Sequence, residues 1–221
     1  MLRKIPLANG EVYHIFTRSI ADYHIFNDAS EFLRMIQLMR YYQFENELRF
    51  SEFLDYKLVQ SFGFDSALKT ITKDKKPIVQ IIAYCLMPTH PHLILKQLND
   101  NGITKYLSNI LNGYTRYFNT KHKRKGPLWE SEFKNVLVDS DEQLYHLSRY
   151  LHLNPVTARL VETPENWVFS SYREYISKAN CAEICDFRDQ MNIKPSSYKK
   201  FVNDQISYQR ELDKIKHLIL E

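Results

Sequence analysis

Hydrophobic and polar positions along the chain follow two patterns, which divide most of it into strands and helices. Four short runs are rich in β-branched, aromatic and aliphatic residues, the composition of strands: residues 11–18, 78–87, 92–98 and 129–138. Three longer runs repeat apolar residues every three or four positions, as one face of a helix does: residues 31–42, 103–119 and 141–154. The predicted order is strand, helix, strand, strand, helix, strand, and then a further helix.

That order is typical of a βαββαβ sandwich, in which an antiparallel sheet packs against helices. We therefore predict an α+β fold of the ferredoxin-like kind. Residues 44–77 interrupt it with short apolar runs and a polar break, so we interpret them as a helical insertion. One main domain is expected over residues 1–178, followed by a helical C-terminal extension over 179–221, in which residues 198–206 and 211–220 are amphipathic.

Polar residues mark where two helices should begin, and a proline marks where one should end. Asp28 is placed to cap the helix over residues 31–42, and the run from Asp139 to Glu142 supplies caps for the helix over 141–154. Proline disfavours helical backbone at the residue before it, so the latter helix is expected to end just before Pro155.

Composition and charge narrow the class of protein. Hydrophobic residues make up 44% of the 221 residues and there are only five glycines, which indicates a globular chain with a sizeable core. The three cysteines form no C-x-x-C pair, so neither a disulfide framework nor a cysteine zinc site is expected. No run reaches the length of a signal-peptide core or a membrane span, so we expect a cytoplasmic protein with no membrane partner.

Two histidines one residue apart lie between two apolar runs. His90 and His92 point to the same face if this stretch is a strand, because side chains alternate with a period of two. Two neutral imidazoles so placed can chelate one divalent ion, which needs at least one further ligand from elsewhere. Pro91 between them lacks an N–H group, so the strand is expected at a sheet edge or to be irregular there. His14, in the first predicted strand, is expected to be structural.

Two blocks of the sequence resemble a known family. Met87-Pro-Thr-His-Pro-His-Leu93 resembles M-P-N-H-V-H-L, the HUH motif of the single-tyrosine transposases, which include insertion-sequence transposases and REP-associated tyrosine transposases. Thr89 and Pro91 replace the usual asparagine and aliphatic residue. Arg149-Tyr-Leu-His-Leu-Asn-Pro-Val-Thr-Ala-Arg-Leu-Val161 resembles the family's R-Y-I-H-L-N-P-V-R-A-G-L-V segment. The resemblance covers roughly residues 9–176.

This resemblance implies the chemistry of the site. It implies that Tyr150 is the nucleophile, and that His90 and His92 hold Mg²⁺ or Mn²⁺ with Asn154 as the third ligand. Tyr150 and Asn154 are four residues apart, so a helix places them on one face. A phenolate can attack a phosphodiester and keep the bond energy in a 5′-phosphotyrosine, which a 3′-OH reseals without a nucleotide cofactor. The family also implies a homodimer that acts on single-stranded or hairpin DNA.

A basic stretch follows the second predicted helix. Residues 101–134 hold seven Lys or Arg against two Glu, a net charge of +5 that exceeds the +4 of the whole chain. The preceding helix carries Tyr106, Tyr114, Tyr117 and Phe118, and cations interleaved with aromatic residues suit phosphates and stacked bases. The residues expected to bind nucleic acid are Arg116, Lys121, Lys123, Arg124 and Lys125.

Other candidate residues are interpreted as structural. His146 and His152 fall on other faces of the tyrosine helix and are expected to be structural or surface residues. The run from Trp167 to Tyr172 also resembles an element of the family and is expected to be a packing element. No G-x-x-x-x-G-K phosphate loop is present, which disfavours ATP-driven chemistry.

The sequence therefore favours a metal-dependent transposase or endonuclease that cleaves and rejoins single-stranded DNA at hairpin or palindromic sites through a 5′-phosphotyrosine. A second hypothesis is a domesticated protein that binds nucleic acid on the same fold without cutting it. A third is a metal hydrolase that uses only the histidine pair, whose turnover would survive loss of the tyrosine.

Overall fold

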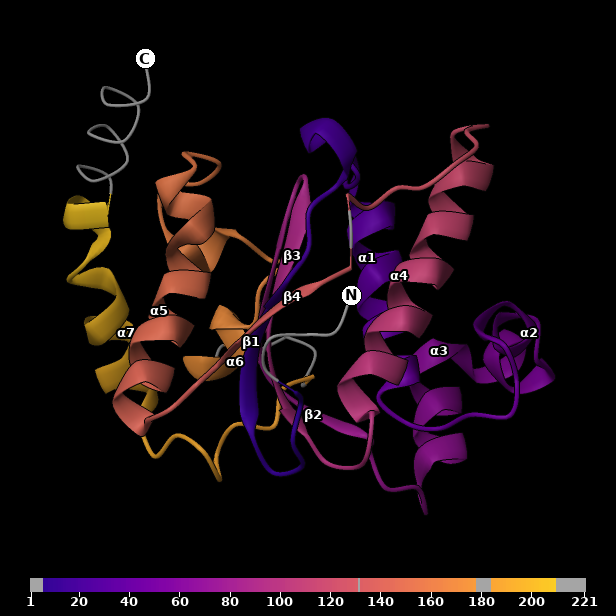
Figure 1. Cartoon of the computed structure of the whole chain (residues 1–221), viewed down its shortest axis with the longest axis horizontal. Helices are drawn as coiled ribbons and strands as arrows, with labels where there is room; N and C mark the ends of the chain where they lie inside the picture. The colour runs from indigo at the N-terminus through magenta and orange to yellow at the C-terminus, as the bar shows by residue number, and fades with distance from the viewer. Residues whose placement is uncertain (1–5, 131, 178–183, 210–221) are drawn as a thin grey trace. The chain divides into compact units, whose positions relative to one another are not determined.

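A computed structural model of the chain describes residues 6–130, 132–177 and 184–209 (Figure 1). They form two compact units, each assembled from separate stretches of sequence. The first unit takes the chain up to residue 11 together with 19–80 and 96–130, and the second takes 12–18, 81–95 and the described residues after 131. The second unit contains every residue expected at the catalytic site, whereas the first contains the five cations expected to bind nucleic acid.

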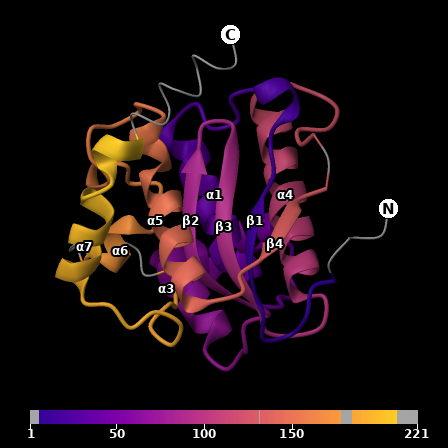
Figure 2. The same ribbon diagram turned by 60° about the vertical axis from the view of Figure 1, so that its left-hand side comes forward.

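Four strands form one sheet: β1 (Val12–Phe16), β2 (Val79–Met87), β3 (His90–Gln97) and β4 (Lys134–Leu137). Their order across the sheet is β2-β3-β1-β4, which is visible in Figure 2. β1 and β4 are antiparallel, and β2 and β3 form a hairpin, so the sheet is antiparallel. The predicted α+β fold of the ferredoxin-like kind is confirmed, with all four strands in the expected segments.

The strand that carries the histidine pair is not an edge strand. β3 lies between β2 and β1 and continues through Pro91, so neither the edge position nor the irregularity expected from Pro91 is observed, whereas the prediction that the two histidines lie on a central or near-central strand is confirmed. Pro91 is the second residue of β3, directly after the two-residue turn Pro88–Thr89. A proline at the very end of a strand, beside a turn, removes little from the hydrogen-bond ladder, which is why an inner strand accepts it there.

Helices of the second unit gather beside the sheet: α5 (Asp141–Thr157), α6 (Tyr172–Tyr175) and α7 (Pro195–Asn203), with the 3₁₀ turn η2 (Pro164–Asn166). Figure 1 shows them in orange and yellow, together on one side of the strands. Their apolar side chains share one core with the inward residues of β1, β2 and β3. That core includes Ile82, Ile94, Leu151, Tyr175 and Tyr198.

The tyrosine helix α5 runs past the point where we expected it to end. Pro155 lies inside α5, which continues to Thr157. The turn after the proline closes with backbone bonds of 2.9 Å from Ala158 N–H to Asn154 O and from Leu160 N–H to Pro155 O. Since Pro155 is so close to the C-terminal end, its missing donor costs only one bond of the last turn, and the helix persists.

The first unit is mainly helical, with α1 (Ala29–Tyr42), α2 (Phe50–Leu54), α3 (Lys57–Thr72), α4 (Gly102–Lys121) and the 3₁₀ turn η1 (Ile20–Asp22). The Asp28 side chain caps α1 by accepting bonds from the N–H groups of Ser30 and Glu31, as predicted. The insertion over residues 44–77 is helical, although α3 is longer than expected and bends at Gly63, whose φ of +79° a glycine adopts without strain.

The C-terminal predictions are only partly within the described residues. α7 corresponds to the helix expected over residues 198–206, shifted by three residues. The boundary expected between residues 178 and 179, and the helix expected over 211–220, lie outside the described residues. None of the helices in the described ranges is long and apolar enough to cross a membrane.

Candidate active site

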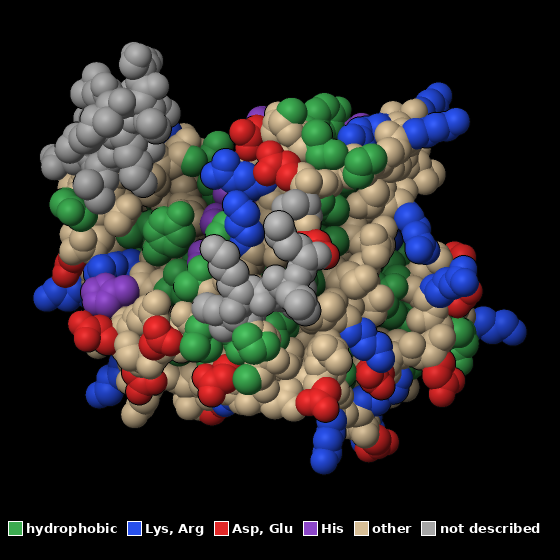
Figure 3. Space-filling model, viewed as in Figure 1, with side chains coloured by type: hydrophobic (Ala, Val, Ile, Leu, Met, Phe, Trp, Pro, Cys, Tyr) green, Lys and Arg blue, Asp and Glu red, His purple; other side chains and the backbone are tan. Residues whose placement is uncertain are grey.

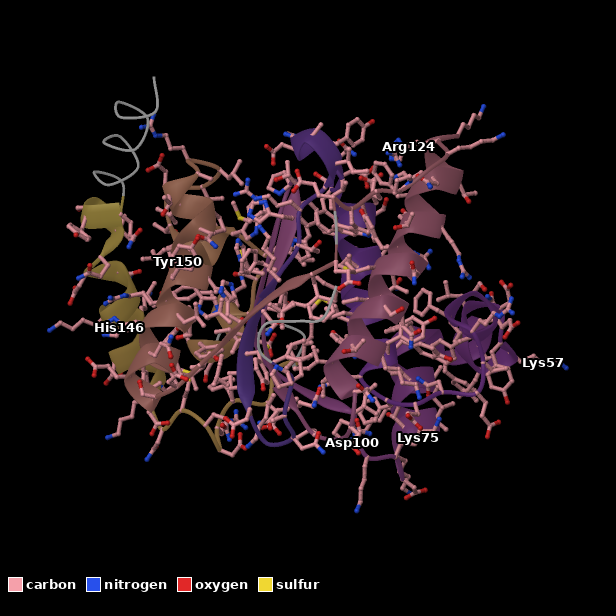
Figure 4. The ribbon with its side chains drawn as sticks, viewed as in Figure 1. Lys57, Lys75, Asp100, Arg124, His146 and Tyr150 are labelled. Atoms are coloured by element: carbon pink, nitrogen blue, oxygen red, sulfur yellow. The ribbon has the colours of Figure 1, made fainter. Side chains whose placement is uncertain are left out.

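Tyr150 and the histidine strand face each other within the second unit. Tyr150 projects from α5, and its ring centroid lies 6.0 Å from that of His92 on β3, with the two rings nearly perpendicular. Figure 4 shows Tyr150 and His146 on α5, where a spacing of four residues places them one turn apart on the same face, so the expectation that His146 falls on another face was wrong. The tyrosine and one of the two expected metal ligands are therefore brought together.

Three histidines form a continuous group on the inner strands. The ring centroids of His90 and His92 are 4.8 Å apart, and His14 from β1 stacks on His92 at 5.3 Å. A hydrogen bond of 3.1 Å joins His14 Nε2 to His92 Nδ1, and one of 2.8 Å joins Thr89 Oγ1 to His90 Nδ1. When His90 and His92 carry their protons on Nδ1, Nε2 is the nitrogen with the lone pair, which is the tautomer that a metal ligand bound through Nε2 requires.

Burial keeps His92 and His14 neutral. His92 is only 8% exposed, and burial together with the nearby His90, His14 and Arg18 holds its pKa well below 6.5. Burial also lowers the pKa of His14 to about 4. A neutral imidazole is the form that binds metal ions, so His92 is in the protonation state that coordination requires.

Tyr150 is accessible but not activated by the protein alone. Its side chain is 43% exposed, so a substrate can reach the hydroxyl. Burial of the rest of the ring raises the pKa of Tyr150 above 10, and the positive charge of Arg18 partly opposes this rise. The phenol is therefore protonated at neutral pH, and use of Tyr150 as a nucleophile would require a further positive charge or a base near its oxygen.

Asn154 is suited to complete a metal site. It follows Tyr150 by one turn of α5, on the same face. Its amide Nδ2 is buried without a hydrogen-bond partner, and because the two amide ends are assigned only from their neighbours, this position fits an amide oxygen turned toward a cation. The described residues contain no group of three or more His, Cys, Asp or Glu arranged to hold a metal. A metal site built on the expected residues His90, His92 and Asn154 would therefore take its third ligand from an amide.

Sequence reasoning missed two residues of this site. His14 was expected to be structural, yet it stacks on His92 and bonds to it. Arg18, which follows β1, is close enough to influence the pKa of both His92 and Tyr150. The sequence does show that His14 shares one face of a strand with Val12 and Phe16. It does not show that β1 adjoins β3, which only the strand order in the sheet reveals.

The five cations expected to bind nucleic acid lie at the end of α4 and in the loop after it, and they differ in surroundings. Lys121 Nζ pairs with Asp28 at 2.6 Å and with Glu31 at 2.8 Å. Arg124 donates to Asn119 Oδ1 and to the carbonyl of Pro127, and so holds its own loop (Figure 4). The three whose side chains are exposed and make no ion pair within the described residues are Arg116, Lys123 and Lys125.

The aromatic residues of α4 mostly serve the core. Tyr106, Tyr114 and Phe118 are fully buried, so they do not offer their rings to nucleic acid as the sequence suggested. Tyr117 is partly exposed and lies under the guanidinium of Arg34 at 4.7 Å. Most Lys and Arg side chains on the face drawn in Figure 3 are spread out rather than gathered in one block.

His152 joins α5 to two other parts of the second unit. Its Nδ1 lies 2.7 Å from Tyr198 Oη on α7, and its Nε2 lies 2.7 Å from Ser171 Oγ. Ser171 Oγ in turn bonds to the backbone of Tyr84 on β2. The structural role expected for His152 is confirmed, and Trp167 is likewise a packing residue, with its indole N–H bonded to Leu86 O at 3.0 Å.

Acid is expected to destabilise the protein through His152. Burial lowers its pKa to about 3, whereas the unfolded chain takes up this proton near pH 6.5. Below pH 6.5 the unfolded state therefore binds more protons, and stability falls by roughly 1.4 kcal/mol per pH unit from this residue until about pH 3. Urea unfolding at pH 7.0 and 5.0 measures the loss.

The matched variant for this experiment is His152→Gln, which keeps a polar side chain but has no proton to gain. Its stability is expected to fall less between the two pH values than that of the unchanged protein. Equal losses in both proteins would contradict the assignment of the acid sensitivity to His152.

Two sequence comparisons relate this chain to transposases. Residues 58–154 match a family described as transposase IS200 like. A Haemophilus influenzae protein named as a REP-associated tyrosine transposase is 25% identical over 103 residues, which cover 42% of this chain. That match spans 58% of the relative's length.

A solved structure shares the fold. The structure of a REP-associated tyrosine transposase bound to a REP hairpin aligns over 85% of this chain and 94% of its own, with a TM-score of 0.51 at 13% identity. The two sequence matches confirm the resemblance of the chain to the single-tyrosine transposases, and the solved structure shows that the fold is shared.

Proposed function

We propose that this chain is a metal-dependent transposase that cleaves and rejoins single-stranded DNA at hairpin or palindromic sites through a 5′-phosphotyrosine intermediate. The single observation that carries the proposal is the approach of Tyr150 to His92, at 6.0 Å between ring centroids, with the imidazole of His92 kept neutral by burial. A tyrosine that only packed against the sheet would have no need of an exposed hydroxyl, and Tyr150 is among the exposed large side chains.

The reaction assigned to Tyr150 is a transesterification. Its oxygen forms a bond to the phosphorus as the bond to the 3′ oxygen of the preceding nucleotide breaks, and that oxygen leaves as a 3′-OH after gaining a proton. The phenolic proton passes to solvent or to a neighbouring base. The positive charge of Arg18 favours the phenolate of Tyr150, and it would also attract the scissile phosphate. Attack by a 3′-OH on the phosphotyrosine reverses these steps and joins two strands.

The residues that would hold Mg²⁺ or Mn²⁺ are His90, His92 and Asn154. When bound there, the ion would polarise the scissile phosphate, favour the ionised phenol and stabilise charge on the departing oxygen. His14 and Thr89 would orient the two proposed ligands. His14 hydrogen-bonds Nδ1 of His92 and Thr89 hydrogen-bonds Nδ1 of His90, which leaves Nε2 of each ring as the nitrogen that would coordinate the ion.

The DNA partner is proposed to include a hairpin. The solved relative is described as bound to a REP hairpin, and this chain has a net charge of +5 over residues 101–134. Exposed Arg116, Lys123 and Lys125 can meet phosphates without first losing an ion pair. We also propose a homodimer, on the family resemblance alone.

Covalent capture of DNA tests the proposal. Labelled single-stranded DNA from the flanks of the gene, incubated with the protein and Mg²⁺ or Mn²⁺, is expected to give an adduct that survives boiling in detergent. Tight, salt-sensitive hairpin binding without an adduct under either metal would favour a non-cleaving binder instead. Free cleaved ends without an adduct would favour a hydrolase that uses only the histidine pair.

Loss of a metal ligand is expected to weaken activity in a way that metal can repair. With His90→Ala or Asn154→Ala, adduct formation at limiting Mg²⁺ should fall by at least about 10-fold, because an incomplete ligand set binds the ion less tightly. High Mn²⁺ should restore part of it, since that metal accepts nitrogen and oxygen donors. The measurement is adduct yield against metal concentration.

The control for this titration is His146→Ala, an exposed histidine on the same helix. It should give the same curve as the unchanged protein. Loss of a metal ligand should change the metal concentration that gives half-maximal adduct yield. If His90→Ala and Asn154→Ala lower the yield but leave that concentration unchanged, His90 and Asn154 do not bind the metal.

A further inference from the structure

A groove in the first unit is built from residues that the tyrosine site does not use. It has a volume of about 830 Å³ and runs between α1, α4 and the start of α2. Its polar lining includes Arg34 from α1, Arg49 at the head of α2 and Arg116 from α4. Its aromatic lining includes Tyr42, Phe50 and Tyr117.

The groove carries uncompensated positive charge. Within the described residues, Arg34, Arg49 and Arg116 form no ion pair with a carboxylate. Asp55 is the acidic residue of the lining, whereas Lys121 at the far end of the groove is already neutralised by Asp28 and Glu31. Three arginines thus face one carboxylate, which favours an anionic occupant.

One arginine is held in place by aromatic rings. The guanidinium carbon of Arg34 lies 4.7 Å from the centroid of Tyr117 and 5.4 Å from that of Phe50. These contacts fix a flexible side chain before any ligand arrives, so less conformational entropy is lost on binding. A planar guanidinium set among ring faces can bind a phosphate through its edge while neighbouring bases stack nearby.

We propose that this groove binds unpaired nucleotides of the substrate DNA, as a second nucleic-acid contact built by the helical insertion together with α1 and α4. The proposal rests on the proposed function and specifies a further contact for its substrate. Three arginines in one groove can contact more than one phosphate of a single strand, and the amides of Asn109 and Asn112 offer hydrogen bonds to bases.

The groove continues toward the basic loop. Arg116 and the exposed Lys125 are nine residues apart along α4 and the loop that follows, and α4 itself rises about 1.5 Å per residue. A strand that lies in the groove and follows α4 would therefore pass from Arg116 to Lys123 and Lys125 within a few nucleotides. An acidic peptide would satisfy the charge but would leave the ring faces without planar partners, so we favour nucleic acid.

Binding of tailed and untailed hairpins tests this assignment. Fluorescence anisotropy compares a labelled hairpin with and without a single-stranded oligo-dT tail, over a series of salt concentrations. The unchanged protein should bind the tailed hairpin at least about 10-fold more tightly than the untailed one, because stacking and phosphate contacts act together. The variant Arg49→Gln with Arg116→Gln removes two exposed cations and leaves the packed Arg34 in place.

In that double variant the advantage of the tail should shrink to near zero. The slope of the logarithm of the binding constant against the logarithm of salt concentration, measured for the tailed hairpin, should become less steep by roughly 0.7 for each arginine that contacts a phosphate. The charge-matched control is Lys57→Gln with Lys69→Gln on α3, two exposed lysines outside the groove, of which Lys57 points outward in Figure 4. This control should keep the full advantage of the tail.

A tail advantage that persists in the Arg49 and Arg116 double variant overturns the groove assignment. If the unchanged protein still forms its covalent adduct in that case, the proposed function stands without the groove. Failure of the unchanged protein to bind any DNA would overturn both. Displacement of the tail by polyglutamate, at concentrations that leave the hairpin bound, would assign the groove to an acidic peptide instead.

Discussion

Changing Tyr150 to phenylalanine is expected to abolish the covalent adduct while leaving the fold and DNA binding intact. The substitution keeps the ring that packs edge-on against His92 and removes only the oxygen that would attack the phosphate. Adduct formation should fall by at least about 1000-fold, because no other group can replace a lost nucleophile at the same position. The measurement is adduct yield on denaturing gels, beside hairpin affinity and urea unfolding of the same preparation.

The matched control is Tyr145→Phe, the same change on the same helix. Tyr145 packs against the core of the second unit, so its variant should form adduct at nearly the normal rate. If Tyr150→Phe still forms adduct and another tyrosine variant does not, the nucleophile has been assigned to the wrong residue, although the reaction class would stand.

Mixing two impaired variants at limiting Mg²⁺ tells whether Tyr150 acts within its own chain. Tyr150→Phe lacks the nucleophile, and His90→Ala lacks one of the proposed metal ligands. Because Tyr150 lies beside His92 of the same chain, the mixture is expected to form no more adduct than the His90→Ala variant that it contains. Recovery of activity on mixing would mean that the tyrosine of one subunit serves the histidines of another.

Changing His152 to alanine is expected to have the largest effect on stability of any single substitution in the second unit. The imidazole is fully buried and bonds to both Tyr198 on α7 and Ser171. Its removal leaves a cavity and takes a partner from two buried hydroxyls, at a cost of about 3–5 kcal/mol. Since folded proteins are stable by about 5–15 kcal/mol, much of the protein would be unfolded at moderate urea concentrations.

Urea unfolding measures this loss directly, and His146→Ala is the natural comparison. His146 is an exposed histidine on the same helix, bonded to Arg149, and its removal should cost less than about 0.5 kcal/mol. Similar losses in the two variants would mean that the bonds of His152 contribute little. A further variant, Tyr198→Phe, removes one hydroxyl without leaving a cavity. Its loss of unfolding free energy should lie between the losses of His146→Ala and His152→Ala.

The sheet and the reactive residues could be predicted from the sequence because their signals are local. Each strand is a short run of strand-forming residues, and His90 and His92 share a face by simple alternation. Tyr150 and Asn154 share a helix face for the same kind of reason. Resemblance to a family then gave these residues their roles, which the geometry alone would have left open.

Other features could not be predicted because they depend on contacts between distant residues. His14 and His92 are 78 residues apart, and only the order of strands brings them together. The C-terminal end of α5 was predicted too early. The free-energy cost of a proline such as Pro155 depends on how far it lies from the end of the helix, which the sequence does not show. The groove of the first unit draws Arg34, Arg49 and Arg116 from three elements, and no spacing in the sequence marks such a set.

The inner position of β1 bears on how copies of this gene would decay. The family match begins at residue 58, so a copy that has lost its first 57 codons would still encode His90, His92 and Tyr150. Its product would lack β1, which lies between β3 and β4 and is the partner of β4. Without β1, β4 has no neighbouring strand to pair with, and His92 loses its hydrogen bond to His14. Such a remnant would keep both recognisable motifs and still be inactive.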